Sequence, residues 1–244
     1  MTLSTEGDAA RLKARIAGVL YLGTMVSGAL DIAVSSSVIV HGDAAATAAK
    51  IMASEPLFRL GFVADLLGGA FYVGVTAILY DLLKPVSRTV SMTAAFFSLV
   101  GCAVGAACAV DLLAPVTILS GGASLNAFTP SQLQALALTA LRLHALGYTI
   151  AMVFFGVYCA LLGYLTFRSS FFPRLLGVLL MLAGLGWLAD TTTAFLWPSL
   201  QDAVSPVSMA LGFVGEGSLM LWLLVVGVNA PKWQSAALAA EAMA

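Results

Sequence analysis

The chain has 244 residues, of which 61% are hydrophobic and only 9% are charged, and its formal net charge at pH 7 is −1. Soluble domains carry about 25% charged residues, so this chain has too little polar surface for a soluble fold and is predicted to be an integral membrane protein. It contains no cluster of basic residues that could bind phosphates, so a nucleic-acid partner is not expected.

Six long apolar runs follow one another along the chain. Each reaches or exceeds the roughly 20 residues that cross a bilayer core as a helix. The runs cover residues 16–38, 58–83, 90–119, 135–167, 175–197 and 204–228. They predict an all-α fold, a polytopic transmembrane bundle of about six helices that forms a single membrane domain over residues 1–244. Arg11, Lys13 and Arg15 precede the first run as in a signal peptide, but the five further runs favour a retained first helix.

The segments between the runs carry signals of helix ends. In the first connection, residues 44–54 are rich in alanine and favour a helix. Ser54 followed by Pro56 then predicts the start of a new helix. Loops are predicted at residues 84–89, 120–131, 168–174 and 198–205.

Lysine and arginine residues collect on one side of the predicted bundle. With six spans both termini share a side, and that side holds Arg11, Lys13, Arg15, Lys84, Arg88, Arg168, Arg174 and Lys232. The opposite side has only Lys50 and Arg59, near the start of the second run, and Arg142 lies within the fourth run. Because cytoplasmic segments of membrane proteins are enriched in Lys and Arg, we predict that the N and C termini are both cytoplasmic.

Every run also contains an ionisable residue. In chain order these are Asp31, Asp65, Asp111, Arg142 with His144, Asp190 and Glu216. A charged side chain at mid-membrane costs roughly 2.5–3.5 kcal/mol, so we expect these groups to face the protein, to be neutralised or to bind something. In the predicted orientation they all map to the outer half or the middle of the bilayer.

Asp65 and Glu216 are the candidate catalytic residues. Glycines lie on or beside the helical face of each acid, and such small residues let helices approach closely or leave space for a ligand. One acid could stay protonated away from water while the other stays ionised beside Arg142. Such a pair can donate and accept a proton.

Four further residues are candidates for ligand binding or charge compensation, namely Arg142, His144, Tyr148 and Asp190. Arg142 is the expected counter-ion of Asp65, Asp190 or Glu216. His144 and Tyr148 share one helical face and would form a hydrogen-bonding wall. The alternative is structural: Arg142 could form an internal ion pair and His144 could serve in packing.

Metal and cofactor signals are missing from the sequence. There is no H-E-x-x-H motif, phosphate-binding loop, dinucleotide fingerprint or G-x-S-x-G elbow. The cysteines at 102, 108 and 159 lack C-x-x-C spacing and are read as packing residues. We therefore expect no metal and no cofactor.

Several stretches of the sequence are shared with one family. They are ARIAGVLYL at 14–22, ASEPLFRLG at 53–61, VFFG at 153–156, LLGYL at 161–165, PRLLGVL at 173–179, and VGE at 214–216 with LWLL at 221–224. By these motifs nearly the whole chain resembles the bacterial membrane family called domain of unknown function 4386. The resemblance implies a multi-pass protein of the bacterial inner (cytoplasmic) membrane and implies no particular activity.

The matching stretches also bear on the site. Arg59 and Glu216 fall within them, and the wider match over nearly the whole chain also covers Asp65, His144 and Asp190. The resemblance therefore adds Arg59 to the candidate ligand-binding residues. Tyr158 stands where many relatives have a second histidine. That difference argues against a two-histidine metal site in this chain.

The leading functional hypothesis is a buried acidic pocket in the outer half of the bilayer that binds a small or lipid-like molecule, with acid–base chemistry as an option. One alternative is a proton- or cation-coupled transporter that uses the same residues as a relay. The other is a structural or partner-binding membrane subunit. The expected surroundings are the lipid bilayer; the sequence leaves enzymatic activity and oligomeric state open.

Overall fold

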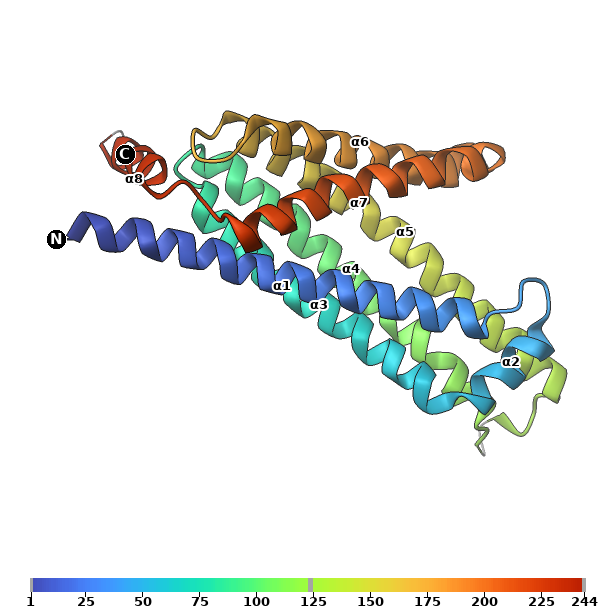
Figure 1. Cartoon of the computed structure of the whole chain (residues 1–244). Coiled ribbons are helices and arrows are strands. Elements are labelled where there is room, and N and C mark those ends of the chain that lie inside the picture. Colours follow the sequence, from blue (N-terminus) through green and yellow to red (C-terminus); the bar gives the residue numbers. More distant parts are fainter. Residues whose placement is uncertain (1, 123–124, 243–244) are drawn as a thin grey trace. The chain divides into compact units, whose positions relative to one another are not determined.

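The computed structural model describes residues 2–122 and 125–242, and these form helices without any β-strand (Figure 1). In chain order the helices are α1 (Thr2–Val38), α2 (Ala44–Ala53), α3 (Glu55–Leu83), α4 (Arg88–Leu119), α5 (Pro130–Arg168), α6 (Arg174–Leu196), the 3-10 turn η2 (Pro198–Leu200), α7 (Gln201–Val225) and α8 (Ala230–Glu241). Six of them are long and apolar enough to cross a membrane. The all-α architecture with six spans is therefore confirmed.

The predicted ends of the first three spans, at Val38, Leu83 and Leu119, coincide with the ends of α1, α3 and α4. The starts differ more, because polar residues that lie outside an apolar run still extend a helix. The clearest case is α5, which begins at Pro130 inside the predicted 120–131 loop. Thr129 and Gln132 account for this early start of α5. Each side chain accepts a hydrogen bond from the other residue's backbone N–H, and this arrangement is a capping box.

The helix predicted in the first connection is present as α2. Asp43 caps it by accepting a hydrogen bond from the backbone N–H of Ala46 at 2.8 Å. Gly42 precedes the cap with a φ of +80°, a conformation that side-chain-bearing residues rarely adopt. The next helix, α3, begins at Glu55, next to the predicted start at Ser54.

The described chain folds into two compact units. Unit 1 comprises Met1–Leu22, Phe71–Cys102 and Ile150–Ala244, and unit 2 comprises Gly23–Ala70 and Ala103–Thr149. Four helices are divided between the units and contribute one segment to each of them: α1, α3, α4 and α5. Unit 1 also contains α6, α7 and α8, and unit 2 also contains α2.

In unit 1, glycines bring α5 and α6 into backbone contact. A Cβ added at Gly163 would lie 2.7 Å from the carbonyl oxygen of Gly177, and one added at Gly184 would lie 2.6 Å from that of Gly156. The two crossings are seven residues apart on each helix, so both fall on the same face. Small residues at such crossings are typical of membrane helix packing.

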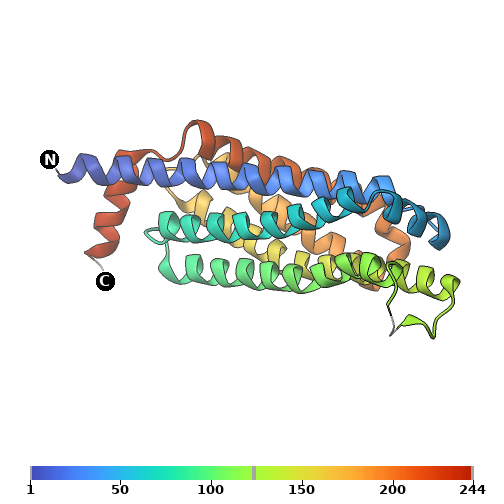
Figure 2. The same cartoon turned by 90° about the horizontal axis from the view of Figure 1, so that it is seen from below.

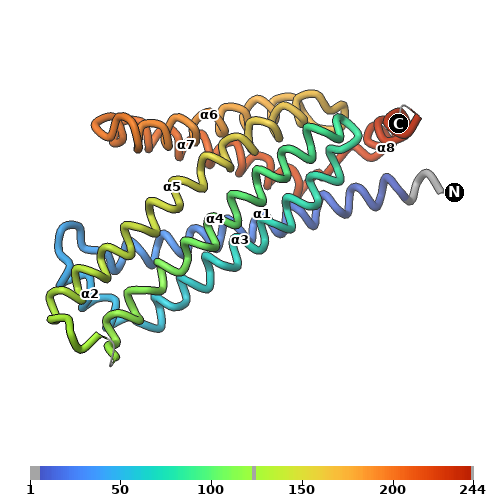
Figure 3. Tube along the Cα trace, turned by 180° about the vertical axis from the view of Figure 1, so that it is seen from behind, coloured from blue at the N-terminus to red at the C-terminus, as the bar shows by residue number. Residues whose placement is uncertain are grey.

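Unit 1 also contains α7, α8 and parts of α1, α3 and α4. Helices α6 and α7 run side by side and are joined by η2 (Figure 1). The end of α3 and the start of α4 form a hairpin (Figure 3). Helix α8 crosses near the start of α1 (Figure 2). At this crossing Gly7 lies against Ala230. The Trp233 indole N–H also donates a hydrogen bond to the Leu82 carbonyl at 2.9 Å, which fixes α8 to α3.

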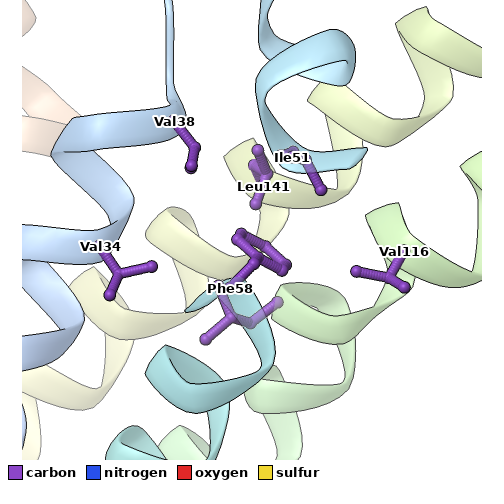
Figure 4. Close-up of a cluster of buried hydrophobic side chains, with 7 residues drawn as sticks. Val34, Val38, Ile51, Phe58, Val116 and Leu141 are labelled. Atoms are coloured by element: carbon purple, nitrogen blue, oxygen red, sulfur yellow. The ribbon is translucent and has the colours of Figure 1, made fainter. Parts of the chain in front are cut away.

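Unit 2 has an apolar core to which all five of its helical segments contribute (Figure 4). Phe58 of α3 is 2% exposed and lies among aliphatic side chains from α1, α2, α4 and α5. The buried members of the cluster are Val34, Val38, Ile51, Phe58, Leu112, Val116 and Leu141. Helix α2 therefore closes one end of unit 2 with an apolar face.

Candidate functional site

Glu216 lies within the membrane-spanning part of α7, with Gly215 before it and Gly217 after it. Both glycines are buried, and a Cβ at Gly215 would lie 2.6 Å from the carbonyl oxygen of Leu179 in α6. The lack of side chains on either side therefore lets α7 approach its neighbours at the depth of the acid. Here the glycines provide close helix packing rather than open space.

Three side-chain donors from three other helices converge on the Glu216 carboxyl group. The Tyr21 hydroxyl of α1 donates to Oε2 at 2.6 Å and the Tyr72 hydroxyl of α3 donates to the same oxygen at 3.2 Å. The Trp187 indole N–H of α6 donates to Oε1 at 3.1 Å. All four residues belong to unit 1, and we call them the Glu216 cluster.

Aromatic rings enclose the Glu216 cluster. The Tyr72 ring makes edge-to-face contacts with Tyr21, Phe155 and Tyr158 at centroid distances of 5.5, 5.1 and 5.9 Å. Such geometry is favourable for aromatic pairs and fixes the direction in which each hydroxyl points. Tyr158 is itself buried, and its hydroxyl makes no hydrogen bond of good geometry with the described residues.

The geometry of the Glu216 cluster suits an ionised carboxylate. Three neutral groups donate to it, and the 2.6 Å separation from Tyr21 is typical of an O–H···O⁻ hydrogen bond. No ion pair between described residues includes Glu216. Among the described residues of unit 1, the carboxyl group is therefore met by oriented dipoles rather than by a cation.

A second group of ionisable residues lies in unit 2. Asp31 of α1 and Asp65 of α3 interact electrostatically with each other and with His144 of α5. The Nδ1 atom of His144 lies 3.0 Å from the Cys108 carbonyl oxygen. Because a carbonyl can only accept, Nδ1 carries the proton, and Nε2 of a neutral ring is left as an acceptor. We call these three residues the Asp65 cluster.

Asp190 takes part in a third polar group, at the turn between α6 and α7 in unit 1. The Gln201 amide nitrogen donates to Asp190 Oδ1 at 3.0 Å, and the Gln201 amide oxygen accepts from the Thr193 hydroxyl at 3.0 Å. Gln201 thereby joins the first turn of α7 to the last turns of α6. We call these residues the Asp190 cluster.

The other predicted site residues lie at exposed positions. Arg142 is exposed on α5 and belongs to no ion pair within the described part of unit 2, so its role as counter-ion stays a prediction. Tyr148 is 51% exposed, whereas His144 on the next turn is partly buried. Arg59 pairs with Glu55 one turn earlier in α3 at 2.8 Å.

Asp65 and Glu216 thus lie in clusters of different units, and their joint use in catalysis stays a prediction. Within the described residues, no group of three or more His, Cys, Asp or Glu side chains is arranged to hold a metal ion. The cysteines at 102, 108 and 159 are free thiols.

Sequence reasoning missed the partners of Glu216. Tyr72 and Trp187 offered a signal, because aromatic residues with a polar atom usually lie at the membrane interface and these two lie in the middle of their apolar runs. Asp31, for which no site role was predicted, interacts electrostatically with Asp65. Gln201 carried no signal in the sequence.

The six spans and the acids placed inside them define a multi-pass α-helical membrane protein. Within that class, the chain belongs to the family described as Domain of unknown function (DUF4386), whose model matches residues 16–227. The chain is also similar to a protein of Archaeoglobus fulgidus that bears the name Uncharacterized protein: the two are 29% identical over 157 residues, or 64% of this chain and 76% of that protein. No solved structure matches the chain.

The comparisons confirm the family that the sequence motifs indicated. Because the relative above comes from an archaeon, the bacterial origin implied by the resemblance stays a prediction, as does the inner membrane as the location. The multi-pass membrane character follows from the six spans themselves.

Proposed function

We propose that this protein binds a small or lipid-like molecule within the bilayer and that Glu216 exchanges a proton with it. The observation that supports this most is the Glu216 carboxylate, which lies in a membrane span, accepts three hydrogen bonds from neutral donors and belongs to no ion pair among the described residues. An ionisable residue in such a place is by default a candidate for function.

An acid at this position differs from a glutamine in two properties. The side-chain oxygen of a glutamine could accept hydrogen bonds from Tyr21 and Tyr72 without the roughly 2.5–3.5 kcal/mol that a charge costs at mid-membrane, but its NH2 group would face the Trp187 indole N–H, which is also a donor. Glutamate also adds the ability to bind and release a proton. The proposal assigns that property to the function of the site.

Protonation of Glu216 would change the contacts of four helices. An ionised carboxylate only accepts hydrogen bonds, whereas a protonated one also donates. If the proton resides on Oε2, which faces both tyrosine hydroxyls, one of these donors must turn away or become an acceptor. The buried Tyr158 hydroxyl lies beside the same rings and offers a further polar atom to a bound molecule.

The Asp65 cluster is the second acid–base group in this proposal. His144 has its Nδ1 atom held by the Cys108 carbonyl, so Nε2 can accept a proton while Asp31 and Asp65 stabilise the charged ring. In the proposal Asp65 handles protons in unit 2, with Arg142 as its counter-ion and with Tyr148 and Arg59 as contacts of a ligand bound there. In unit 1 Glu216 handles protons, and Asp190 is a candidate contact of a ligand bound in that unit.

One observation favours the second candidate, a proton-coupled transporter. Acidic residues within spans occur in both units, as Asp31 and Asp65 in unit 2 and as Glu216 in unit 1. A carrier needs such groups along its path to move a proton from one side to the other. Proton flux into vesicles that contain the protein would separate this function from binding alone.

The proposal is tested by infrared difference spectroscopy of the protein in lipid nanodiscs, titrated between about pH 4 and pH 10. We expect a band of a protonated carboxyl group that is absent from the Glu216→Gln variant and unchanged in Asp202→Asn, which removes an exposed acid of the same helix. Mass spectrometry of molecules that co-purify in mild detergent should show a defined species in the wild-type protein. A titration without any Glu216-dependent band would refute the proton exchange.

A further inference from the structure

An apolar groove lies between α6 and α7 in unit 1. Its volume is about 340 Å³, near the lower end of the range of roughly 300–1,000 Å³ for small-molecule sites. The groove is lined by Leu182, Leu185, Gly186, Ala189, Ala203, Val204, Val207, Ser208 and Leu211. Apart from the Ser208 hydroxyl, the lining side chains offer hydrocarbon contacts alone.

Small side chains leave this groove open between two helices that otherwise pack closely. At the end of the groove that is farther from the α6–α7 turn, Gly186 lies against Ser208. A Cβ added at Gly186 would be 3.3 Å from the Ser208 Cα. Toward the turn, the facing residues are Ala189 and Ala203, whose methyl groups do not fill the space between the helices. The groove therefore has the shape and the chemistry for a hydrocarbon chain.

The Asp190 cluster lies beside the turn end of the groove. Asp190 follows the lining residue Ala189, and Gln201 lies two residues before the lining residue Ala203. Gln201 and Thr193 hold the Asp190 side chain in place by one continuous set of hydrogen bonds. Asp190 is six residues from the end of α6, or about 9 Å along the helix axis. A molecule in the groove can thus place its polar end against a fixed carboxyl group.

The charged residues around the groove determine which kind of headgroup the bound molecule can have. Residues 175–231 contain three acids, Asp190, Asp202 and Glu216, and no Lys, Arg or His. Asp190 belongs to no ion pair among the described residues. All Lys and Arg residues of unit 1 lie near the opposite ends of its helices. A headgroup with a net negative charge would be repelled here, whereas the ammonium group of a headgroup without net charge would gain a charge-assisted hydrogen bond.

We infer that the groove between α6 and α7 binds one hydrocarbon chain of a membrane lipid whose primary amine headgroup contacts Asp190. The lipid chemistry that fits is that of phosphatidylethanolamine, which combines an ammonium donor with apolar chains. The inference does not rest on proton exchange at Glu216, because the lining residues and the Asp190 cluster include none of the Glu216 cluster.

Native mass spectrometry tests the inference with the full chain in mild detergent and equimolar added phosphatidylethanolamine and phosphatidylglycerol. We expect the wild-type protein to retain one phosphatidylethanolamine with about tenfold preference, as suits one charge-assisted hydrogen bond. Asp190→Asn, which keeps the oxygen that accepts from Gln201, should abolish the preference. Asp202→Asn is the matched control, since it removes an exposed acid of the same turn, and should retain it.

The groove itself is tested by the double substitution Ala189→Leu with Ala203→Leu. Both alanines are exposed residues of the lining, and the larger leucine side chains would fill the groove. This variant should lose retention of both lipids, whereas Ala210→Leu, at an exposed α7 position outside the groove, should not. Equal retention of the two lipids by the wild-type protein would overturn the amine contact, and retention by the filled variant would overturn the groove. No variant in this experiment changes a residue of the Glu216 cluster, so failure of the proton-exchange proposal would leave these lipid-retention results unchanged.

Discussion

At the scale of single residues, the Glu216 cluster depends most on Tyr21. The Tyr21 hydroxyl makes the shortest of the three hydrogen bonds to the carboxylate, and the side chain is 1% exposed. Hydrogen bonds to charged groups contribute about 1.5–3 kcal/mol, so Tyr21→Phe should lower the free energy of unfolding by about that amount. Tyr72→Phe should cost less, because its bond is longer at 3.2 Å.

Unfolding in mixed micelles, followed by circular dichroism, measures both changes. Tyr164→Phe provides the control, since this tyrosine is 44% exposed and its hydroxyl makes no hydrogen bond to Glu216. In the Glu216→Gln background the cost of Tyr21→Phe should shrink, as a double-mutant cycle requires for groups in contact. Equal stability of the Tyr21 and Tyr164 variants would contradict the importance of this contact.

Arg59 illustrates how a predicted site residue can be tested separately from stability. It pairs with Glu55 one turn away on α3, and the two side chains are 53% and 32% exposed. Exposed pairs at this spacing contribute about 0.3–0.5 kcal/mol, so Arg59→Ala should leave the unfolding midpoint almost unchanged. If the variant nevertheless loses the co-purifying molecule, Arg59 contacts that molecule; unchanged retention would remove Arg59 from the proposed ligand contacts.

Which residues the sequence could reveal depends on how far their partners lie along the chain. The Thr129–Gln132 box and the Arg59–Glu55 pair are local, and their spacing is visible in the sequence. Glu216 could be singled out because an acid stands out in an apolar run. Its partners could not be assigned, since Tyr21 lies 195 residues away and a single sequence contains no information about such pairs.

At the scale of helices, the contact between α5 and α6 depends on its glycines. An added Cβ at Gly163 would lie 2.6 Å from the Met181 nitrogen and 2.7 Å from the Gly177 oxygen, and neither backbone atom can move aside alone. Gly163→Ala should therefore separate the two helices and lower the free energy of unfolding by about 1–3 kcal/mol. The same unfolding measurement in mixed micelles checks this value.

Gly105 of α4 supplies the matched control for Gly163. A Cβ there would meet nothing within 4 Å, so Gly105→Ala should be neutral or should stabilise the helix by up to about 1 kcal/mol through higher helix propensity. Equal free energies of unfolding for Gly163→Ala and Gly105→Ala would show that α5 and α6 tolerate separation. The opposite signs expected here cannot arise from helix propensity, which favours alanine at both positions.

Helices were easier to predict than their contacts for a physical reason. Backbone polar groups inside a bilayer must be satisfied within each segment, so a long apolar run has to be helical, and its ends can be read from composition. Which faces meet depends on side-chain fit across helices. Gly61 against Val34 and Gly147 against Cys108 are such fits, and nothing in the chain marks these partners.

At the scale of the whole molecule, the distribution of Lys and Arg predicts the orientation in the membrane. Eight of these residues lie on the side of the termini, whereas the opposite side has Lys50 and Arg59 near the start of the second span, and Arg142 lies within the fourth. The cytoplasmic surface of a membrane is negatively charged and attracts each nearby basic residue by about 1 kcal/mol, so the side with eight should face the cytoplasm. Ser131, which precedes the fourth span, should then face outward.

Cysteine labelling in intact cells tests this orientation. Ser131→Cys and Ala239→Cys each introduce one thiol at an exposed position, in a background where Cys102, Cys108 and Cys159 are replaced by alanine. A membrane-impermeant maleimide should label position 131 in intact cells and position 239 only after lysis. Labelling of position 239 alone in intact cells would reverse the orientation, and it would place the Asp190 cluster at the turn of α6 and α7 near the cytoplasmic leaflet instead of the outer one.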